Sequence, residues 1–229
     1  MWTKYTQYYV LVIGLTFAVG LGQAWAAAGQ HGHQPDRTPN IMEYIDRLDR
    51  PERDQYQKPA QVMEALALKP GMSIADIGSG SGYFTSRFAE AVSHSGKVYA
   101  VDVEPKALDY IKEGLARTGS RSSVEFVLAR PDDPTLPDAS IDLIFICNTF
   151  HHLDNRPQYF RNLRSVLKPR GRIAIIDYFH DERSGDLGFP KDHLVAREAV
   201  LSQMSEAGYR LISEHDFLPR QYFLEFAPR

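Results

Sequence analysis

The sequence predicts an α/β fold in which a seven-stranded, mostly parallel sheet carries helices on both faces and ends in an antiparallel hairpin. Short apolar runs alternate with helical stretches from residue 73 onward, a rhythm typical of a parallel sheet covered by helices. Most of these runs are continuously apolar, as expected of strands buried on both faces. The last two runs, residues 209–217 and 222–226, are joined by four residues, and so short a connection requires an antiparallel pair.

The remaining elements follow from the same patterns. Parallel strands are predicted at residues 73–77, 97–101, 123–128, 141–147 and 172–177. Helices are predicted at residues 40–48, 59–68, 83–92, 105–117, 156–167 and about 193–207. Pro105 suits the first position of its helix, and Pro169 is expected to end the helix before it. Gly208 suits the left-handed position that follows a helix.

Composition excludes several classes of protein. Of the 229 residues, 43% are hydrophobic and 24% charged, which is ordinary for a globular chain and excludes a disordered, collagen-like or multi-span membrane protein. A net charge of -3 argues against nucleic acid as a partner, because basic surfaces carry that affinity. The single cysteine, Cys147, permits no intrachain disulfide and no cysteine-based metal site.

Residues 1–28 are predicted to be a secretory signal peptide. An apolar run at residues 8–21 follows Lys4 and ends in Ala24-Trp25-Ala26, the small-residue pattern of a cleavage site. A retained membrane anchor is an alternative, since residues 8–28 approach the roughly 20 that span a bilayer, and a buried core helix is another. Both export interpretations place the rest outside the cytoplasm, in the periplasm or anchored to the inner membrane. Residues 29–39 are predicted to be a linker, and residues 40–229 one domain.

A glycine-rich loop carries the strongest functional signal. Asp76 lies in the first strand, and the loop Gly78-Ser79-Gly80-Ser81-Gly82 joins that strand to a helix. Glycines here allow unusual backbone angles and close approach of a ligand. Asp102 follows at the end of the second strand, where an acid can accept hydrogen bonds from both hydroxyls of a ribose.

Two common nucleotide motifs do not match this loop. A dinucleotide fingerprint needs G-x-G-x-x-G, but Tyr83 stands at the position of its third glycine. The phosphate-binding sequence G-x-x-x-x-G-K-[ST] is also missing from the loop. A loop that serves only to pack the strand against the helix is the alternative to a nucleoside site.

The motifs resemble, in order, those of class I S-adenosylmethionine-dependent methyltransferases over about residues 56–226. The matching stretches are residues 76–82, 101–102, 137–143, 151–153 and 167–172. The resemblance implies a Rossmann-like fold and S-adenosylmethionine as cofactor, bound by Asp76, Gly78, Ser79, Gly80, Gly82, Asp102, Asp132 and Asn148. In these roles the glycines shape the turn, Asp76 steadies it and Asp102 binds the ribose. Residues 48–59 are similar to a stretch of predicted exported methyltransferases, and they form either a solvated linker or a segment that brings Tyr56 and Gln57 over the cofactor.

Two positions depart from the family pattern. Where many relatives carry Gly-Asp after the third strand, this chain has Ala129-Arg130. Arginine only donates, so it cannot accept a hydrogen bond from the adenine amino group. Asp132 or a backbone group is expected to replace that contact. Arg170 stands where relatives show a glycine, behind the sheet and away from the site.

His151 and His152 are the candidate catalytic residues. They follow the fourth strand, at the edge where open α/β sheets bind ligands. A neutral imidazole can take a proton from the acceptor; alternatively the pair only positions the next helix. We therefore expect methyl transfer to a small-molecule acceptor, without a metal. A protein isoaspartate O-methyltransferase-like enzyme and a non-catalytic module that binds the nucleoside are the alternatives.

Overall fold

The computed structural model describes residues 41–118, 123–187 and 190–229. The predicted signal peptide and linker lie outside these residues. Within the described ranges, no helix is long and apolar enough to cross a membrane.

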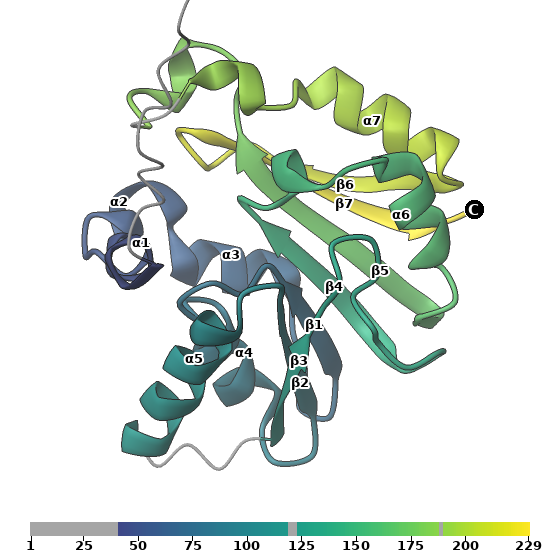
Figure 1. Cartoon of the computed structure of the whole chain (residues 1–229). Coiled ribbons are helices and arrows are strands. Elements are labelled where there is room, and N and C mark those ends of the chain that lie inside the picture. Colours follow the sequence, from purple (N-terminus) through teal and green to yellow (C-terminus); the bar gives the residue numbers. More distant parts are fainter. Residues whose placement is uncertain (1–40, 119–122, 188–189) are drawn as a thin grey trace, which may run out of the picture. The chain divides into compact units, whose positions relative to one another are not determined.

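One seven-stranded sheet forms the centre of the fold, as predicted (Figure 1). Its strands are β1 Ser73–Ile77, β2 Lys97–Asp102, β3 Ser123–Leu128, β4 Ile141–Cys147, β5 Leu167–Tyr178, β6 Tyr209–His215 and β7 Gln221–Pro228. They lie in the order β3-β2-β1-β4-β5-β7-β6. Strands β1 to β5 are parallel, and β7 runs antiparallel to both β5 and β6. The chain order reverses beside β1, so the crevice between β1 and β4 opens at a carboxyl edge where ligands bind.

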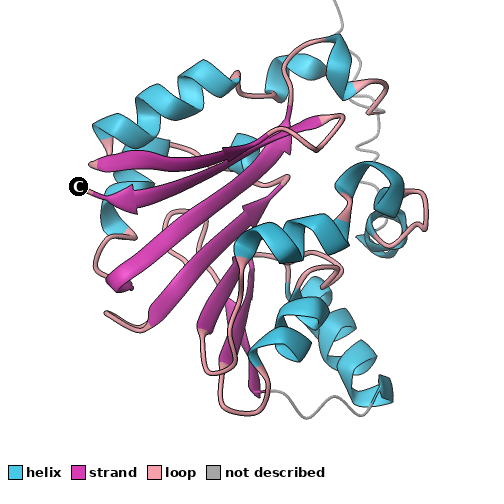
Figure 2. Ribbon diagram, turned by 180° about the vertical axis from the view of Figure 1, so that it is seen from behind, coloured by secondary structure: helices cyan, strands magenta, loops and turns pink. Residues whose placement is uncertain are grey.

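Helices cover both faces of the sheet, as the apolar strands require (Figure 2). The α-helices are α1 Ile41–Leu48, α2 Arg53–Gln57, α3 Pro59–Leu66, α4 Thr85–Val92, α5 Pro105–Thr118, α6 Arg156–Asn162 and α7 Arg197–Glu206. Three short 3-10 helices are η1 Phe150–His152, η2 Glu182–Ser184 and η3 Lys191–His193. Side chains of α3 and α4 join one buried cluster and those of α6 and α7 another. The two clusters lie on opposite faces because successive strand residues point to opposite sides.

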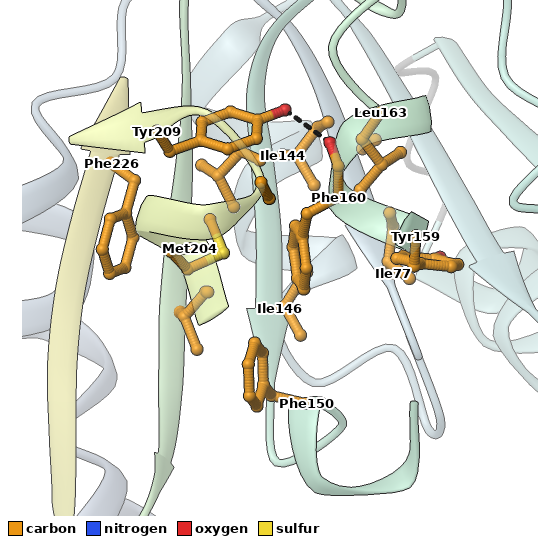
Figure 3. Close-up of a cluster of buried hydrophobic side chains, with 14 of the residues drawn as sticks. Ile77, Ile144, Ile146, Phe150, Tyr159, Phe160, Leu163, Met204, Tyr209 and Phe226 are labelled. Atoms are coloured by element: carbon orange, nitrogen blue, oxygen red, sulfur yellow. Dashed lines mark hydrogen bonds between the residues drawn. The ribbon is translucent and has the colours of Figure 1, made fainter. Parts of the chain in front are cut away.

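The core beneath α6 and α7 is aromatic-rich (Figure 3). Phe150 and Phe160 stack with ring centroids 5.5 Å apart. The hydroxyl of Tyr209 donates to the Phe160 carbonyl at 2.9 Å, so this buried phenol keeps a hydrogen-bond partner. This cluster fixes the turn that carries the two histidines, because Phe150 opens η1.

Strand β5 begins earlier than predicted, and the expected end of α6 at Pro169 is wrong. Helix α6 ends at Asn162 and β5 begins at Leu167. A register shift separates Ile141, which pairs with Leu167, from Leu143, which pairs with Arg172. Pro169 lies inside this irregularity, where no ladder hydrogen bond is required of it.

Other boundaries also differ. Helix α7 begins at Arg197 because Ala196 before it is extended, and α4 begins at Thr85 rather than residue 83. The charged segment before the first strand contains α2, whose Arg53 and Gln57 are buried. The solvated-linker interpretation of this segment is therefore wrong.

Candidate cofactor and acceptor site

A cavity of about 360 Å³ opens at the carboxyl ends of β1, β2 and β4. Its walls include both glycine-loop and histidine-turn residues, and most are apolar. The lining residues that matter below are Ile45, Leu48, Arg53, Gly78, Ser79, Gly80, Asp102, Ala129, Arg130, Asn148, Thr149, His152, Leu153 and Tyr159. The cavity thus brings together Gly78, Ser79, Gly80, Asp102, Asn148 and His152 of the predicted site. Asp76, Gly82, Asp132 and His151 do not line it.

The glycine loop is held against the neighbouring strand. The backbone N–H groups of Gly78 and Ser79 donate to the Val101 carbonyl at 2.8 and 3.1 Å. Gly78 has a φ of 74°, and a Cβ there would lie 2.2 Å from Thr149 Oγ1. Glycine is therefore required at this position both by conformation and by space, and the loop presents bare backbone to the cavity.

Asp102 lies at the tip of β2 beside this loop. Its carboxylate accepts hydrogen bonds from the backbone N–H of Gly80 at 2.9 Å and of Glu104 at 3.0 Å. Burial raises the pKa of Asp102, while the backbone donors oppose that rise. A carboxylate with two oxygens has room for further donors, so Asp102 can accept from ribose hydroxyls.

Asp76 lies under the loop rather than in the cavity. It is buried, and Thr85 Oγ1 donates to its carboxylate at 2.6 Å. Burial raises the pKa of Asp76 to about 7, against the hydrogen bond from Thr85. This contact ties β1 to the first residue of α4, across the glycine loop, and fits the steadying role that the resemblance implies.

Three other predicted cofactor residues lie in different surroundings. Asn148 follows β4 with a φ of 55°, lines the cavity and accepts from Gln221 Nε2 at 2.5 Å. Gly82 turns toward α5, where a Cβ would lie 2.8 Å from Ile111 Cγ1. Asp132 is exposed, and its contact with adenine stays a prediction.

The two candidate histidines have different environments. His151 is buried, with Nδ1 at 2.8 and 2.9 Å from the two carboxylate oxygens of Asp177. His152 lines the cavity, and its ring centroid lies 4.1 Å from that of His151. Burial, followed by the neighbouring His151, lowers the pKa of His152. His152 is therefore neutral near pH 7 and able to accept a proton.

Arg53 is a site residue that sequence reasoning missed. This α2 side chain is buried, lines the cavity and donates from Nη1 to the Leu48 carbonyl at 2.8 Å. Its guanidinium lies 3.9 Å from the Tyr83 ring centroid, and its buried Nε has no hydrogen-bond partner. No ion pair joins Arg53 to a carboxylate of the described residues. Its charge acts on the buried Asp76, whose pKa it lowers, but a buried donor without a partner is costly. Arg53 is therefore the candidate receptor for an anion in the cavity.

These features fit S-adenosylmethionine. The cofactor has a ribose that matches Asp102, a carboxylate that matches the guanidinium of Arg53, and an amino-acid chain that needs the bare backbone at Gly78 and Gly80. The lining residues Val103, Ala107 and Ala129 are apolar, which suits the packing of an adenine ring. Tyr56 and Gln57, expected over the cofactor, do not line the cavity; Ile45 and Leu48 of α1 cover it instead.

Comparison with known proteins gives the same family. A family model described as a methyltransferase domain matches residues 75–175. The ubiquinone/menaquinone biosynthesis C-methyltransferase UbiE of Hahella chejuensis is 30% identical over 116 residues, which cover 51% of this chain and 47% of that protein. UbiE of Vibrio vulnificus is 26% identical over 155 residues, which cover 66% of this chain and 60% of that protein. The match spans 47% and 60% of the lengths of these two curated relatives.

A solved structure extends the likeness over nearly a whole domain. It is the crystal structure of a SAM-dependent methyltransferase from Aquifex aeolicus, with a TM-score of 0.74 and 30% sequence identity. The match covers 80% of this chain and 96% of that one. The seven-stranded Rossmann-like sheet, the antiparallel hairpin and the cofactor class agree with the expectations from the sequence. The chain belongs to the S-adenosylmethionine-dependent methyltransferases.

Proposed function

We propose that this protein transfers a methyl group from S-adenosylmethionine to a small-molecule acceptor that loses a proton in the reaction. The observation that carries the proposal is the shared cavity: His152, Asp102 and the glycine loop line the same space. A proton acceptor and a nucleoside site are thereby within one small volume.

The cofactor side of the cavity supplies binding and orientation. When bound, S-adenosylmethionine would supply a methyl group on a positively charged sulfur: an electron pair of the acceptor would bond to the methyl carbon while the carbon–sulfur bond breaks, and S-adenosylhomocysteine would leave. Asp102 accepts from the ribose hydroxyls, and Arg53 pairs with the carboxylate. Gly78 and Gly80 leave room for the part of the cofactor that joins its ribose to its carboxylate. Fixing both reactants in one geometry lowers the barrier, because alignment is a large part of such catalysis.

The acceptor side supplies the base. His152 takes the proton from the acceptor and passes it to solvent, since it is partly exposed. Leu153, the next residue, also lines the cavity and gives the acceptor an apolar contact. An acceptor with an acidic hydroxyl suits this arrangement, because its deprotonation raises the electron density of the nucleophile.

A carbon acceptor is the second candidate, favoured by the names of the curated relatives. The two UbiE proteins are described as C-methyltransferases. A ring carbon becomes nucleophilic when a hydroxyl on that ring loses its proton, so the same base serves both outcomes. The mostly apolar lining of the cavity accommodates an aromatic ring.

Binding and transfer are tested separately. Calorimetry with S-adenosylmethionine and S-adenosylhomocysteine measures binding; titration without heat change at any temperature tried would contradict the proposal. A screen with ¹³C-methyl-labelled cofactor then presents metabolite extracts, hydroxylated aromatics and an isoaspartyl peptide. The carbon shift of the labelled product distinguishes an O-methyl from a C-methyl group. Binding without transfer to any acceptor would favour the non-catalytic module, and labelled isoaspartyl peptide would favour the isoaspartate enzyme.

We also propose that residues 1–28 direct the protein out of the cytoplasm. The support is the sequence pattern alone: a charged start, an apolar run and small residues around Ala26. Cleavage places the enzyme in the periplasm, and retention places it at the inner membrane.

A further inference from the structure

Asp177, at the end of β5, is a buried acid that neither the sequence motifs nor the cofactor site account for. Its exposed fraction is 0%. The carboxylate accepts from the backbone N–H of His151 at 3.0 Å and of Tyr178 at 2.8 Å. Both oxygens also contact His151 Nδ1. The whole hydrogen-bonding capacity of this acid is therefore directed at the turn after β4 and at its own strand.

The chemistry of the carboxylate fixes the imidazole of His151. An ionised carboxylate only accepts hydrogen bonds, so Nδ1 of His151 must carry the hydrogen that it shares with Asp177. A histidine held by an acid in this way keeps one tautomer and one ring orientation. The His151 side chain is 3% exposed, which leaves it outside the reach of an acceptor in the cavity.

His152 depends on this buried pair for its place. Its ring lies against that of His151 at 4.1 Å with a tilt of 48°, and both belong to the single turn η1. Other groups also face the pair. They are Cys147 at the end of β4, Arg156 of α6, which donates to the His151 carbonyl, His193 of η3 and Tyr222 of β7.

We propose that Asp177 is a positioning residue that divides the roles of the two histidines: it anchors His151 through Nδ1, and His151 in turn holds the His152 ring in the cavity as the proton acceptor. The inference rests on the proposed function for the role of His152. The assignment of His151 as an anchor stands on geometry alone. It separates two adjacent, identical residues, of which family resemblance alone favours His152 as the one that faces the acceptor.

Nitrogen-15 NMR of the histidine rings in the full-length protein tests the anchor directly. Two variants, His151→Gln and His152→Gln, assign the two sets of signals by their loss. We expect His151 in the unaltered protein to carry its hydrogen on Nδ1, with a ring proton that exchanges slowly with water. His152 should titrate below the ordinary histidine midpoint of about 6.5. A His151 ring with its hydrogen on Nε2, or an Nδ1 proton that exchanges rapidly with water, would overturn the inference.

Asp177→Asn tests the source of that tautomer. The amide has one oxygen, so its nitrogen must face one of the two backbone N–H groups, and we expect loss of the slowly exchanging Nδ1 proton. If this variant does not fold, the measurement on the unaltered protein still decides. A retained Nδ1 proton in a folded Asp177→Asn protein would overturn the role of Asp177.

Chemical rescue separates anchor from base once an acceptor is known. In His152→Gly, added imidazole should raise the transfer rate at least about ten-fold over that of the same variant without imidazole, because a free base can occupy the vacated space. In His151→Gly it should not, since a mobile imidazole cannot hold the turn. The opposite result would exchange the two roles. Binding of S-adenosylhomocysteine to both variants is the control. If the unaltered protein does not bind S-adenosylhomocysteine, the proposed function fails, but the NMR result still tests the role of Asp177.

Discussion

The Asp102 carboxylate of β2 accepts a hydrogen bond from the Gly80 backbone N–H at 2.9 Å. The acid at the end of β2 therefore holds the glycine loop that follows the neighbouring strand β1. The same carboxylate accepts from Glu104. The residue that we propose to bind ribose thus already organises the free site. Binding requires little rearrangement of this part of the cavity, which favours affinity.

Replacing Asp102 should weaken cofactor binding. Hydrogen bonds to a charged group contribute about 1.5–3 kcal/mol, so Asp102→Ala should raise the dissociation constant of S-adenosylhomocysteine roughly 10- to 150-fold. Isothermal calorimetry measures the change. Asp109→Ala removes an exposed carboxylate on α5 and is the matched control. Equal affinities of the two variants for S-adenosylhomocysteine would show that Asp102 does not contribute to cofactor binding.

Replacing Arg53 should affect only ligands with a carboxylate. Arg53→Gln should reduce the affinity for S-adenosylhomocysteine about 10- to 100-fold, because a buried charge-assisted contact is lost. The affinity for 5′-methylthioadenosine, which lacks the amino-acid part, should change less than about two-fold. A similar loss for both ligands would show that Arg53 supports the cavity wall and not the carboxylate.

Gly78 should tolerate no side chain. Gly78→Ala places a methyl group 2.2 Å from Thr149 Oγ1 at a φ of 74°, so both the loop and the turn after β4 must shift. We expect lower stability and loss of cofactor binding. Gly114→Ala is the control, because this glycine lies inside α5 with its nearest atom 3.9 Å away. The control should gain about 0.5–1 kcal/mol of stability; thermal unfolding measures both, and a stable Gly78→Ala protein with normal binding would contradict the prediction.

Asp76 should make stability depend on pH. Burial raises its pKa to about 7, whereas an unfolded aspartate has a pKa of about 4. The protonated form therefore favours folding, and that contribution is lost as pH rises from about 4 to 7, by an amount on the order of 4 kcal/mol. Asp76→Asn removes the titration and can still accept from Thr85. The variant should gain stability relative to the natural protein at pH 8 but not at pH 4, as measured by urea unfolding. A constant difference across this range would show that Asp76 does not titrate there.

The location of the protein can be tested with a fusion. Residues 1–40 joined to a reporter that is active only outside the cytoplasm should give activity. Ile13→Arg should abolish it, because a charge in the apolar run opposes membrane insertion. The processed protein should begin at Ala27 or close to it. A product that keeps Met1 in the membrane fraction would replace the signal peptide with an anchor, and a silent reporter would end the export interpretation.

The sequence predicted the parts of the structure that depend on local chemistry. Glycines with a positive φ at Gly78 and Gly80, a strand-end acid at Asp102 and a short connection before β7 are all local signals. The antiparallel direction of the last strand follows from the shortness of that connection. Each of these features is set by residues that are close together in the chain, so a single sequence is enough to recognise them.

The rest depended on burial, which the sequence does not show. Arg53 lies in a run of charged residues that resembles a solvated surface, and only the packing of α2 against Tyr83 removes it from water. His151 and His152 are adjacent and alike, but His151 is buried against Asp177 from a distant strand, whereas His152 lines the cavity. The early start of β5 required knowledge of its pairing with Ile141. In each case the deciding partner is remote in the chain.

The position of β7 has a consequence for how the chain is assembled. Residues Gln221–Pro228 insert between β5 and β6 and hydrogen-bond to both, so the last of the described strands to leave the ribosome fills an internal place in the sheet. Until β7 is in place, β5 is an edge strand with unpaired backbone groups and apolar side chains, to which other chains can add. Shortening the chain before residue 221 should therefore produce aggregation rather than a smaller folded enzyme.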